Sequence, residues 1–251
     1  MLLSDVELLR RLVRIDSTSS ISNLPIAGEI ANYLQSSAEE IVFIEANDEA
    51  KANLLIRFGP DRDGGLILSG HMDAVPALEK DWESDPFTLT ERDDRFVGRG
   101  TADMKGFLAV ATNAAATVDQ LKAPLYLLFT YDEEAGTRGA KHFVDQWDRD
   151  RPLPKHCVIG EPTSFRTVRT HKGHLKLRIT TTGKSAHSGY PHLGDNAIEK
   201  MSCVLDALTK LRCELESERA PHADLFPDAP FVPLNLATIH GGSAVNIVPD
   251  R

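Results

Sequence analysis

The stretch LILSGHMD, residues 66–73, joins a continuous apolar run to polar side chains that follow it directly. A short, nearly continuous apolar run is typical of a strand that is covered on both faces. Two other runs have the same form, LYLLF at residues 125–129 and CVI at residues 157–159, and both lead into polar or acidic residues. The sequence therefore predicts three buried strands, each with potential ligand side chains at its carboxyl end.

Apolar residues also recur at helical spacing in the segments before and between these runs. Ser4 and Glu7 form a capping box at the start of one predicted helix, and Thr137 is the expected cap of another. The predicted helices cover residues 5–15, 104–118 and 137–147, with one more beginning at Pro25, and short β-rich runs cover residues 41–45 and 53–58. Strands that alternate with helices indicate an α/β layered domain, which we place at residues 1–165.

The hydropathy pattern changes after Pro162, because apolar and polar residues now alternate with the period of a half-exposed strand. The predicted elements are a strand over residues 175–179, a helix capped by Asp195, and strands over residues 232–239 and 244–248. A split βαβ sandwich of the ferredoxin-like type needs one more helix and strand to close. We therefore expect residues 166–251 to form a second, α+β domain that is truncated at the C-terminus.

Composition excludes several classes of protein. The chain is 41% hydrophobic and 26% charged, as globular proteins are, and no apolar stretch reaches the roughly 20 residues of a membrane span. Its 28 basic and 37 acidic residues give a net charge of −9, which disfavours nucleic acid and anionic membranes as partners. The first residues lack the basic segment of a signal peptide, so we expect a cytoplasmic protein. Cys157, Cys203 and Cys213 form no CxxC motif and are expected to be buried.

Candidate ligands follow each of the three predicted strands. His71 and Asp73 follow the first, Glu133 and Glu134 the second, and Glu161 the third. Ligands of open α/β sheets bind beyond the carboxyl ends of the strands, so we expect these side chains to converge. One imidazole with several carboxylates suits a catalytic Zn²⁺, Co²⁺ or Mn²⁺ ion with an open position better than a structural zinc site. The period of two also lets Asp73 reach the ring nitrogen of His71 that faces away from the metal.

Each of these motifs has an ordinary structural interpretation as well. A lone HxD motif is usually a hydrogen-bonded polar pair, paired glutamates usually lie on a solvated face, and Asp103 could be the N-cap of the helix predicted over 104–118. Their coincidence at three successive strand ends favours a metal site instead. Adjacent glutamates point in different directions, so one can bind metal while the other acts as a general base toward water.

Four motifs now occur in a fixed order: SGHMDAVP at 69–76, GRGTADMKG at 98–106, DEE at 132–134 and GEPT at 160–163. Together they resemble the M20 family of dinuclear metallopeptidases and deacylases, over essentially the whole chain. Further stretches most resemble those family members that remove the acetyl group from N-acetylornithine: DW at 81–82, DPFTLT at 85–90, HKGH at 171–174, NAIE at 196–199, CELESER at 213–219 and HGG at 240–242.

The resemblance implies a zinc-peptidase-like catalytic domain that holds two divalent ions, Zn or Co. It assigns His71, Asp103 and Glu161 to one ion, and makes Asp103 a bridge to a second ion that Glu134 also binds. Glu133 is then the general base, Asp73 steadies the histidine ligand, and the peptide bond between Asp103 and Met104 is expected to be cis.

The resemblance also implies an inserted lid or dimerisation domain. His187 is expected to reach the active site of a neighbouring subunit and contact the developing oxyanion, with Asn246 nearby as a substrate contact, so a homodimer is expected. The family's last metal ligand, a histidine, lies beyond the position that matches Arg251.

Three functions are open at this point. The leading one is hydrolysis of a small N-acyl amino acid, N-acetylornithine in arginine biosynthesis. The second is another activity of the same family: desuccinylation of succinyl-diaminopimelate, or an aminoacylase or carboxypeptidase activity. The third is a truncated, non-catalytic binding or assembly protein, which the presence of a base at Glu133 disfavours.

Overall fold

The structure is a computed structural model that describes residues 2–46, 50–77, 80 and 82–251. The chain forms two compact units, Met1–Arg169 and Thr170–Arg251. Among the described residues, no helix combines the length and the apolar character that a bilayer crossing requires.

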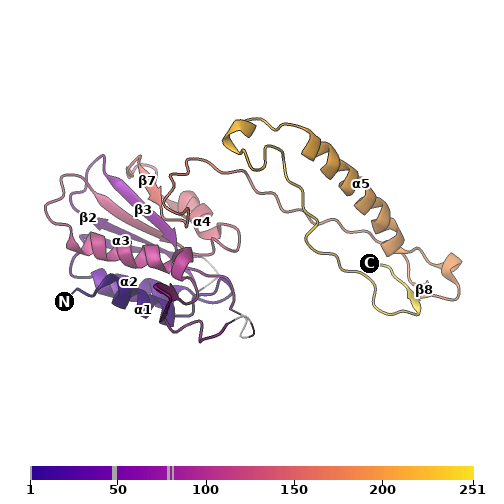
Figure 1. The fold of residues 1–251 in the computed structure, drawn as a ribbon, viewed down its shortest axis with the longest axis horizontal. Coiled ribbons are helices and arrows are strands. Elements are labelled where there is room, and N and C mark those ends of the chain that lie inside the picture. Colours follow the sequence, from indigo (N-terminus) through magenta and orange to yellow (C-terminus); the bar gives the residue numbers. More distant parts are fainter. Residues whose placement is uncertain (1, 47–49, 78–79, 81) are drawn as a thin grey trace. The chain divides into compact units, whose positions relative to one another are not determined.

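A five-stranded sheet with the order β1-β2-β6-β3-β7 forms the centre of the first unit (Figure 1). Its strands are β1 (Glu40–Glu45), β2 (Ala52–Phe58), β3 (Leu66–His71), β6 (Leu125–Thr130) and β7 (Cys157–Ile159). β6, β3 and β7 run parallel, whereas β1 and β2 join them by antiparallel pairing. The three strands predicted from the apolar runs are confirmed as neighbours, with β3 in the middle. A separate hairpin consists of β4 (Thr90–Arg92) and β5 (Arg95–Val97).

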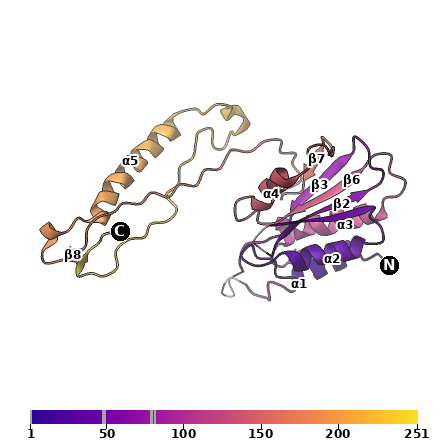
Figure 2. The ribbon, with the colours of Figure 1, turned by 180° about the vertical axis from the view of Figure 1, so that it is seen from behind.

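Helices cover both faces of this sheet (Figures 1 and 2). They are α1 (Asp5–Arg14), α2 (Leu24–Leu34), α3 (Gly106–Thr117) and α4 (Arg138–Gln146). Leu54 and Ile56 of β2 pack in the larger buried cluster with α1, α2 and α3, whereas Leu55 packs on the other face with Phe143 of α4. This alternation follows from the period of two of a strand. The predicted helices are confirmed, and Ser4 caps α1 by accepting a hydrogen bond from the amide of Glu7 at 3.2 Å.

The connections on either side of β3 determine where a ligand binds. The chain passes from β3 through α3 to β6 on one side, and from β6 through α4 to β7 on the other side of β3. Because α3 and α4 lie on opposite faces, the chain leaves β3 and β6 toward opposite sides of the sheet, and ligands of open α/β sheets bind beyond the carboxyl ends of such strands. His71 and the glutamate pair lie at these two strand ends.

The second unit contains one long helix, α5 (Ala197–Ser217), and a short ladder between β8 (Ala186–His187) and β9 (Ile247–Val248). Two 3-10 turns complete it, η3 (Pro191–Leu193) and η4 (Ala223–Leu225). The predicted cap is wrong by one residue, because the side chain of Asn196 rather than Asp195 accepts from the first amides of α5, at 2.9 and 3.2 Å. Asp195 instead exchanges backbone hydrogen bonds with Lys184.

The strands predicted over residues 175–179 and 232–239 are wrong, since residues 170–251 contain no other strand than β8 and β9. The strand predicted over 244–248 is shortened to β9. Alternation shows which side chains share a face, but a strand also needs a hydrogen-bonding partner. Without that pairing, the ferredoxin-like sheet expected here is not formed.

Three further expectations are corrected. All three cysteines are exposed, not buried: Cys157 lies on the edge strand β7, and Cys203 and Cys213 lie on exposed faces of α5. β7 itself is exposed rather than buried. Thr137 occupies the N-cap position of α4 with a left-handed backbone, and its side chain makes no capping hydrogen bond.

Candidate active site

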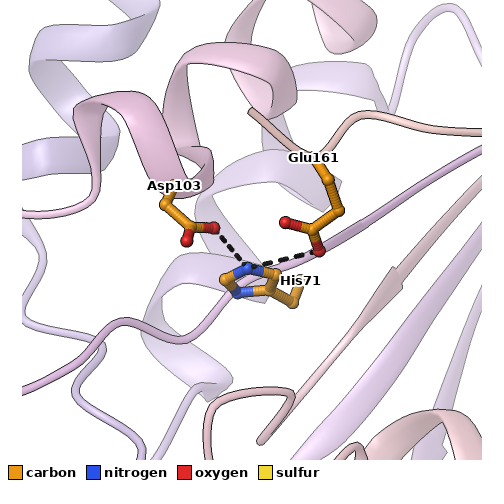
Figure 3. Close-up of side chains that lie close together, drawn as sticks. All are labelled: His71, Asp103 and Glu161. Atoms are coloured by element: carbon orange, nitrogen blue, oxygen red, sulfur yellow. Dashed lines mark hydrogen bonds and ion pairs between the residues drawn. The ribbon is translucent and has the colours of Figure 1, made fainter. Parts of the chain in front are cut away.

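His71 lies at the centre of a cluster of acidic side chains at the end of β3 (Figure 3). The side chain of this residue is 2% exposed, and its Nε2 atom is 2.8 Å from Oδ1 of Asp103 and 3.8 Å from Oε1 of Glu161. Asp103 comes from the segment before α3, and Glu161 comes from the segment after β7. Three parts of the chain therefore meet at one ring nitrogen.

The backbone around Asp103 departs from a regular helix. The turn η2 (Thr101–Lys105) is interrupted by the non-helical dihedral angles of Asp103 and Met104, and the peptide bond between these two residues is cis, as expected. α3 begins only at Gly106, so the alternative that Asp103 is an ordinary N-cap is wrong. Gly70 permits this packing, because a Cβ atom at that position would lie 2.9 Å from the side chain of Met104.

Asp73 links the histidine to the glutamate pair. Its Oδ1 atom is 3.5 Å from Nδ1 of His71, and its backbone oxygen is 3.0 Å from the same nitrogen. Its two carboxylate oxygens also accept hydrogen bonds from the amides of Glu133 at 3.0 Å and Glu134 at 3.2 Å. The contact with the histidine was predicted from the HxD spacing. The contacts with the two amides were not, since nothing in the sequence pairs residue 73 with residues 60 positions away.

The electrostatics of the cluster favour a bound cation. Burial lowers the pKa of His71, but the hydrogen bonds and charges of Asp73 and Asp103 outweigh it and raise that pKa to about 9. Burial and the nearby charge of Asp103 raise the pKa of Glu134, and burial likewise raises the pKa of Glu161, together with Asp103 and against the opposing effect of His71. Carboxylates gathered this closely repel one another, and a divalent cation offsets that repulsion.

The geometry also fits a metal. Ligand atoms of His71, Asp103 and Glu161 all lie within 4.8 Å of one another, and so do those of His71, Glu133 and Glu134. An imidazole nitrogen with carboxylate oxygens is a donor set that Zn²⁺, Co²⁺ and Mn²⁺ accept. The residues present therefore fit the divalent metal ion that the sequence predicts. How the ligands divide between two ions stays a prediction.

A cluster of polar side chains contacts the residues next to the glutamate pair, and the sequence analysis did not identify it. Lys51 and Asp132 form a buried ion pair, and the ammonium group of Lys51 also donates to the backbone oxygen of Ser19. The hydroxyl of Ser19 donates to Asp73 at 2.7 Å. No sequence signal could have found this group, because a single lysine before a strand has no distinguishing spacing.

His187 and Asn246 both belong to the second unit. His187 lies in β8, pairs with Ile247 of β9, and accepts a hydrogen bond at Nδ1 from the amide of Gly189 at 3.0 Å. The amide of Ser188 donates to the backbone oxygen of Asn246 at 3.0 Å, so the two predicted substrate contacts lie close together within this unit. Their roles stay predictions.

The match to a known protein family covers the stretch of chain that contains the four motifs. Residues 67–241 match peptidase family M20/M25/M40. The acetylornithine deacetylase of Vibrio parahaemolyticus is 44% identical over 242 residues, and that of Vibrio campbellii is 43% identical over 242 residues. Each match covers 92% of this chain but only 62% of the relative, so the chain spans less than two thirds of these proteins. Of the stretches that resemble such enzymes, Asp81 lies outside the described residues.

Solved structures agree on the fold. An M20 family metallo-carboxypeptidase from Sulfolobus solfataricus matches 99% of this chain and 69% of its own, with a TM-score of 0.67 and 15% identity. A tripeptidase from Staphylococcus aureus matches 98% of this chain and 63% of its own, with a TM-score of 0.56 and 18% identity. The ordered motifs, the sheet and the family match lead to one conclusion: this chain belongs to peptidase family M20/M25/M40.

Proposed function

We propose that the protein is a metal-dependent amide hydrolase that removes the acetyl group from N-acetylornithine. The observation that carries this proposal is the convergence of His71, Asp103 and Glu161 within 4.8 Å at the carboxyl end of β3. The substrate follows from relatives at 43–44% identity that are named acetylornithine deacetylase. Because the chain spans 62% of their length, the complete reaction is part of the proposal.

Each residue of the cluster has its own role in this proposal. His71, Asp103 and Glu161 would hold one divalent ion, Zn or Co, and Asp103 and Glu134 would hold a second. When bound, such ions polarise the acyl carbonyl and lower the pKa of a coordinated water toward about 7. Glu133 accepts the proton of the attacking water and later returns it to the leaving amine. Asp73 fixes both the ring of His71 and the backbone of Glu133, so the base and the ligand keep one relative orientation.

The second unit supplies the remaining groups in this proposal. His187 donates a hydrogen bond to the developing oxyanion of the substrate in the active site of a neighbouring subunit. Asn246 contacts the same substrate. Loss of one such donor typically lowers the rate by about 10²–10³-fold. This arrangement requires a homodimer. The dimer and the cytoplasmic location both stay predictions.

Ornithine release from N-acetylornithine tests the proposal, measured beside succinyl-diaminopimelate and N-acyl glutamate with Zn²⁺ or Co²⁺ added. Glu133→Gln is expected to lower turnover by about 10²–10⁴-fold while the metal content, measured by elemental analysis, stays the same. Glu91→Gln, an exposed position on β4, is the matched control and keeps full turnover. Faster release from either of the other two substrates would assign a different family activity. Bound metal without turnover in the unchanged chain would favour the non-catalytic binding protein.

A further inference from the structure

A buried ammonium group lies behind the metal site without contacting any proposed ligand. The side chain of Lys51 is 8% exposed, and that of its partner Asp132 is 1% exposed. A buried ion pair adds little net stability compared with apolar side chains of similar volume, because both charges lose their hydration. Its use at this position therefore calls for an explanation other than stability alone.

The contacts of Lys51 provide that explanation. Its ammonium group binds two segments at once, the carboxylate of Asp132 and the backbone oxygen of Ser19. Ser19 donates in turn to Asp73, which holds the ring of His71. Asp132 directly precedes Glu133, so Lys51 connects the histidine side of the site to the glutamate side through short polar contacts.

The turn that carries the glutamates needs such support. Asp132 has a left-handed backbone with φ of 50°, a conformation that is uncommon for residues other than glycine. Directly after it, the amides of Glu133 and Glu134 point at the carboxylate of Asp73. A shift of Asp132 would therefore displace both glutamates relative to His71.

Asn53, two residues after Lys51, binds backbone groups of the segment that carries the glutamates. Asn53 is fully buried, and its Oδ1 atom accepts a hydrogen bond from the amide of Tyr131 at 3.3 Å. Its Nδ2 atom donates to the backbone oxygen of Gly139 at 2.9 Å. Asn53 in β2 therefore binds both ends of the segment 131–139, and Lys51, which directly precedes β2, binds Asp132 between them.

We propose that Lys51, through its contacts with Asp132 and Ser19, is a positioning residue that sets the geometry of the glutamate pair against the metal-binding histidine. The proposal rests on the proposed function of this site. Lys51 also borders a pocket of about 320 Å³ lined in part by Ser20, Ser22 and Arg138. Direct contact with substrate through that pocket is the competing role, and the kinetic constants separate the two roles.

Co²⁺ binding by the full chain tests the positioning role without requiring turnover. Lys51→Met is expected to weaken Co²⁺ binding by about 10-fold, the lower end of the effect of losing a direct partner of a metal ligand, and to change the visible absorption spectrum of the bound ion. Lys141→Met is the matched control, because Lys141 forms an exposed ion pair with Asp145 on α4 and keeps both properties. Equal Co²⁺ affinity and equal spectra in the two variants would overturn the proposal.

The double variant Lys51→Met/Asp132→Asn separates positioning from stability. Lys51→Met is expected to lower the melting temperature, because the buried carboxylate of Asp132 then keeps, among the described residues, only its partly exposed partner Arg138, at 3.3 Å. The double variant is expected to restore the melting temperature, because no carboxylate charge then remains buried at position 132. The Co²⁺ affinity and kcat are expected to stay low, because the link to Ser19 and Asp73 is still missing. Recovery of all three properties would show that the ion pair is only structural and would overturn the proposal.

Steady-state kinetics on N-acetylornithine complete the test. Misplacement of catalytic groups by about 1 Å lowers rates by about 10²-fold, so kcat is expected to fall on that scale in Lys51→Met with KM unchanged. A raised KM with unchanged kcat would assign Lys51 to substrate binding and overturn the proposal. A chain that shows the Lys51-dependent Co²⁺ affinity but hydrolyses none of the tested substrates would contradict the proposed function alone.

Discussion

The two units differ in what their apolar residues contact. In the first unit, both faces of the sheet carry buried clusters, and side chains such as Leu54 and Leu127 are fully buried. In the second unit the buried residues are only Ala197, Ala223 and Val248, whereas Leu175 and Leu177 are 78% and 77% exposed. The second unit nevertheless has a regular hydropathy pattern, since Leu175, Leu177 and Ile179 alternate with polar residues. A regular hydropathy pattern therefore predicts which side chains share an apolar face. A hydrophobic core forms only where another element packs against that face.

Amide hydrogen exchange of the full chain gives the largest expected difference between the units. Amides of β2 and β6 lie in the centre of the sheet and exchange only through global unfolding, so we expect them to exchange at least about 10³-fold more slowly than amides of residues 170–182 and 232–239. Those two segments contain no strand. Mass spectrometry after short labelling times measures the difference.

Protein concentration sharpens this comparison. If the exposed apolar residues of the second unit pair between subunits, the exchange of residues 170–182 slows as the concentration rises, while that of β6 does not change. Strong protection of residues 232–239 in a dilute monomer would contradict the difference between the units.

A matched pair of leucine substitutions tests the same difference energetically. Leu127→Ala removes a side chain that is 0% exposed, and we expect it to lower the free energy of unfolding by about 2–5 kcal/mol. Leu177→Ala removes a side chain that is 77% exposed, and we expect a change within about 0.5 kcal/mol. Urea denaturation followed by far-ultraviolet circular dichroism measures both. A similar loss in the two variants would mean that Leu177 is buried in solution.

The same contrast explains which parts of the fold could be predicted. The runs at residues 66–68, 125–129 and 157–159 were predicted as strands because they are short and nearly continuously apolar, and each pairs with another of them. The alternation at residues 175–179 is just as clear, but nothing in a single sequence states which strand it pairs with. Burial of β7 was wrong for a related reason, because the edge position of a strand is a property of the whole sheet.

The sequence predicted more of the candidate site than of the second unit. His71 ends β3, and Glu133 and Glu161 lie within three residues of the ends of β6 and β7, so parallel strands bring them to one edge of the sheet. Lys51 and Ser19 could not be predicted, because both lie outside the helices and strands, and their contacts with Asp132 and Asp73 join residues far apart in the sequence. Such contacts depend on chain geometry rather than on residue spacing.

Asp73→Asn tests whether the first unit's polar contacts orient the metal ligands. The asparagine keeps the volume of the side chain but loses its charge, and its amide group cannot accept from both glutamate amides. We expect Zn²⁺ affinity to fall by about 10–100-fold, measured by competition with a chromophoric chelator. Asp206→Asn, an exposed position on α5 that pairs with Lys210, is the control from the second unit and keeps the affinity. An unchanged affinity in Asp73→Asn would contradict its orienting role.

The smallest expected effect concerns surface ion pairs, where the two units differ least. Partial burial raises the pKa of Glu40, but hydrogen bonds and charges from Arg151 and Arg57 outweigh it and hold that pKa below its ordinary value of 4.5. A carboxylate with a lowered pKa stabilises the fold above its ordinary pKa, and this contribution is lost as the pH falls through the folded-state pKa.

Glu40→Gln is therefore expected to lower the free energy of unfolding at pH 7 by less than about 1 kcal/mol, because the pair is partly exposed. The difference from the unchanged chain should shrink as the pH falls below 4.5, where Glu40 itself becomes protonated in the unfolded state. Glu216→Gln on α5, whose carboxylate lies 3.9 Å from Arg212, is the matched substitution in the second unit and is expected to have no measurable effect at either pH. Urea denaturation at pH 7 and pH 3 compares them, and a difference for Glu40→Gln that grows toward pH 3 would contradict the stabilising role of its arginine partners.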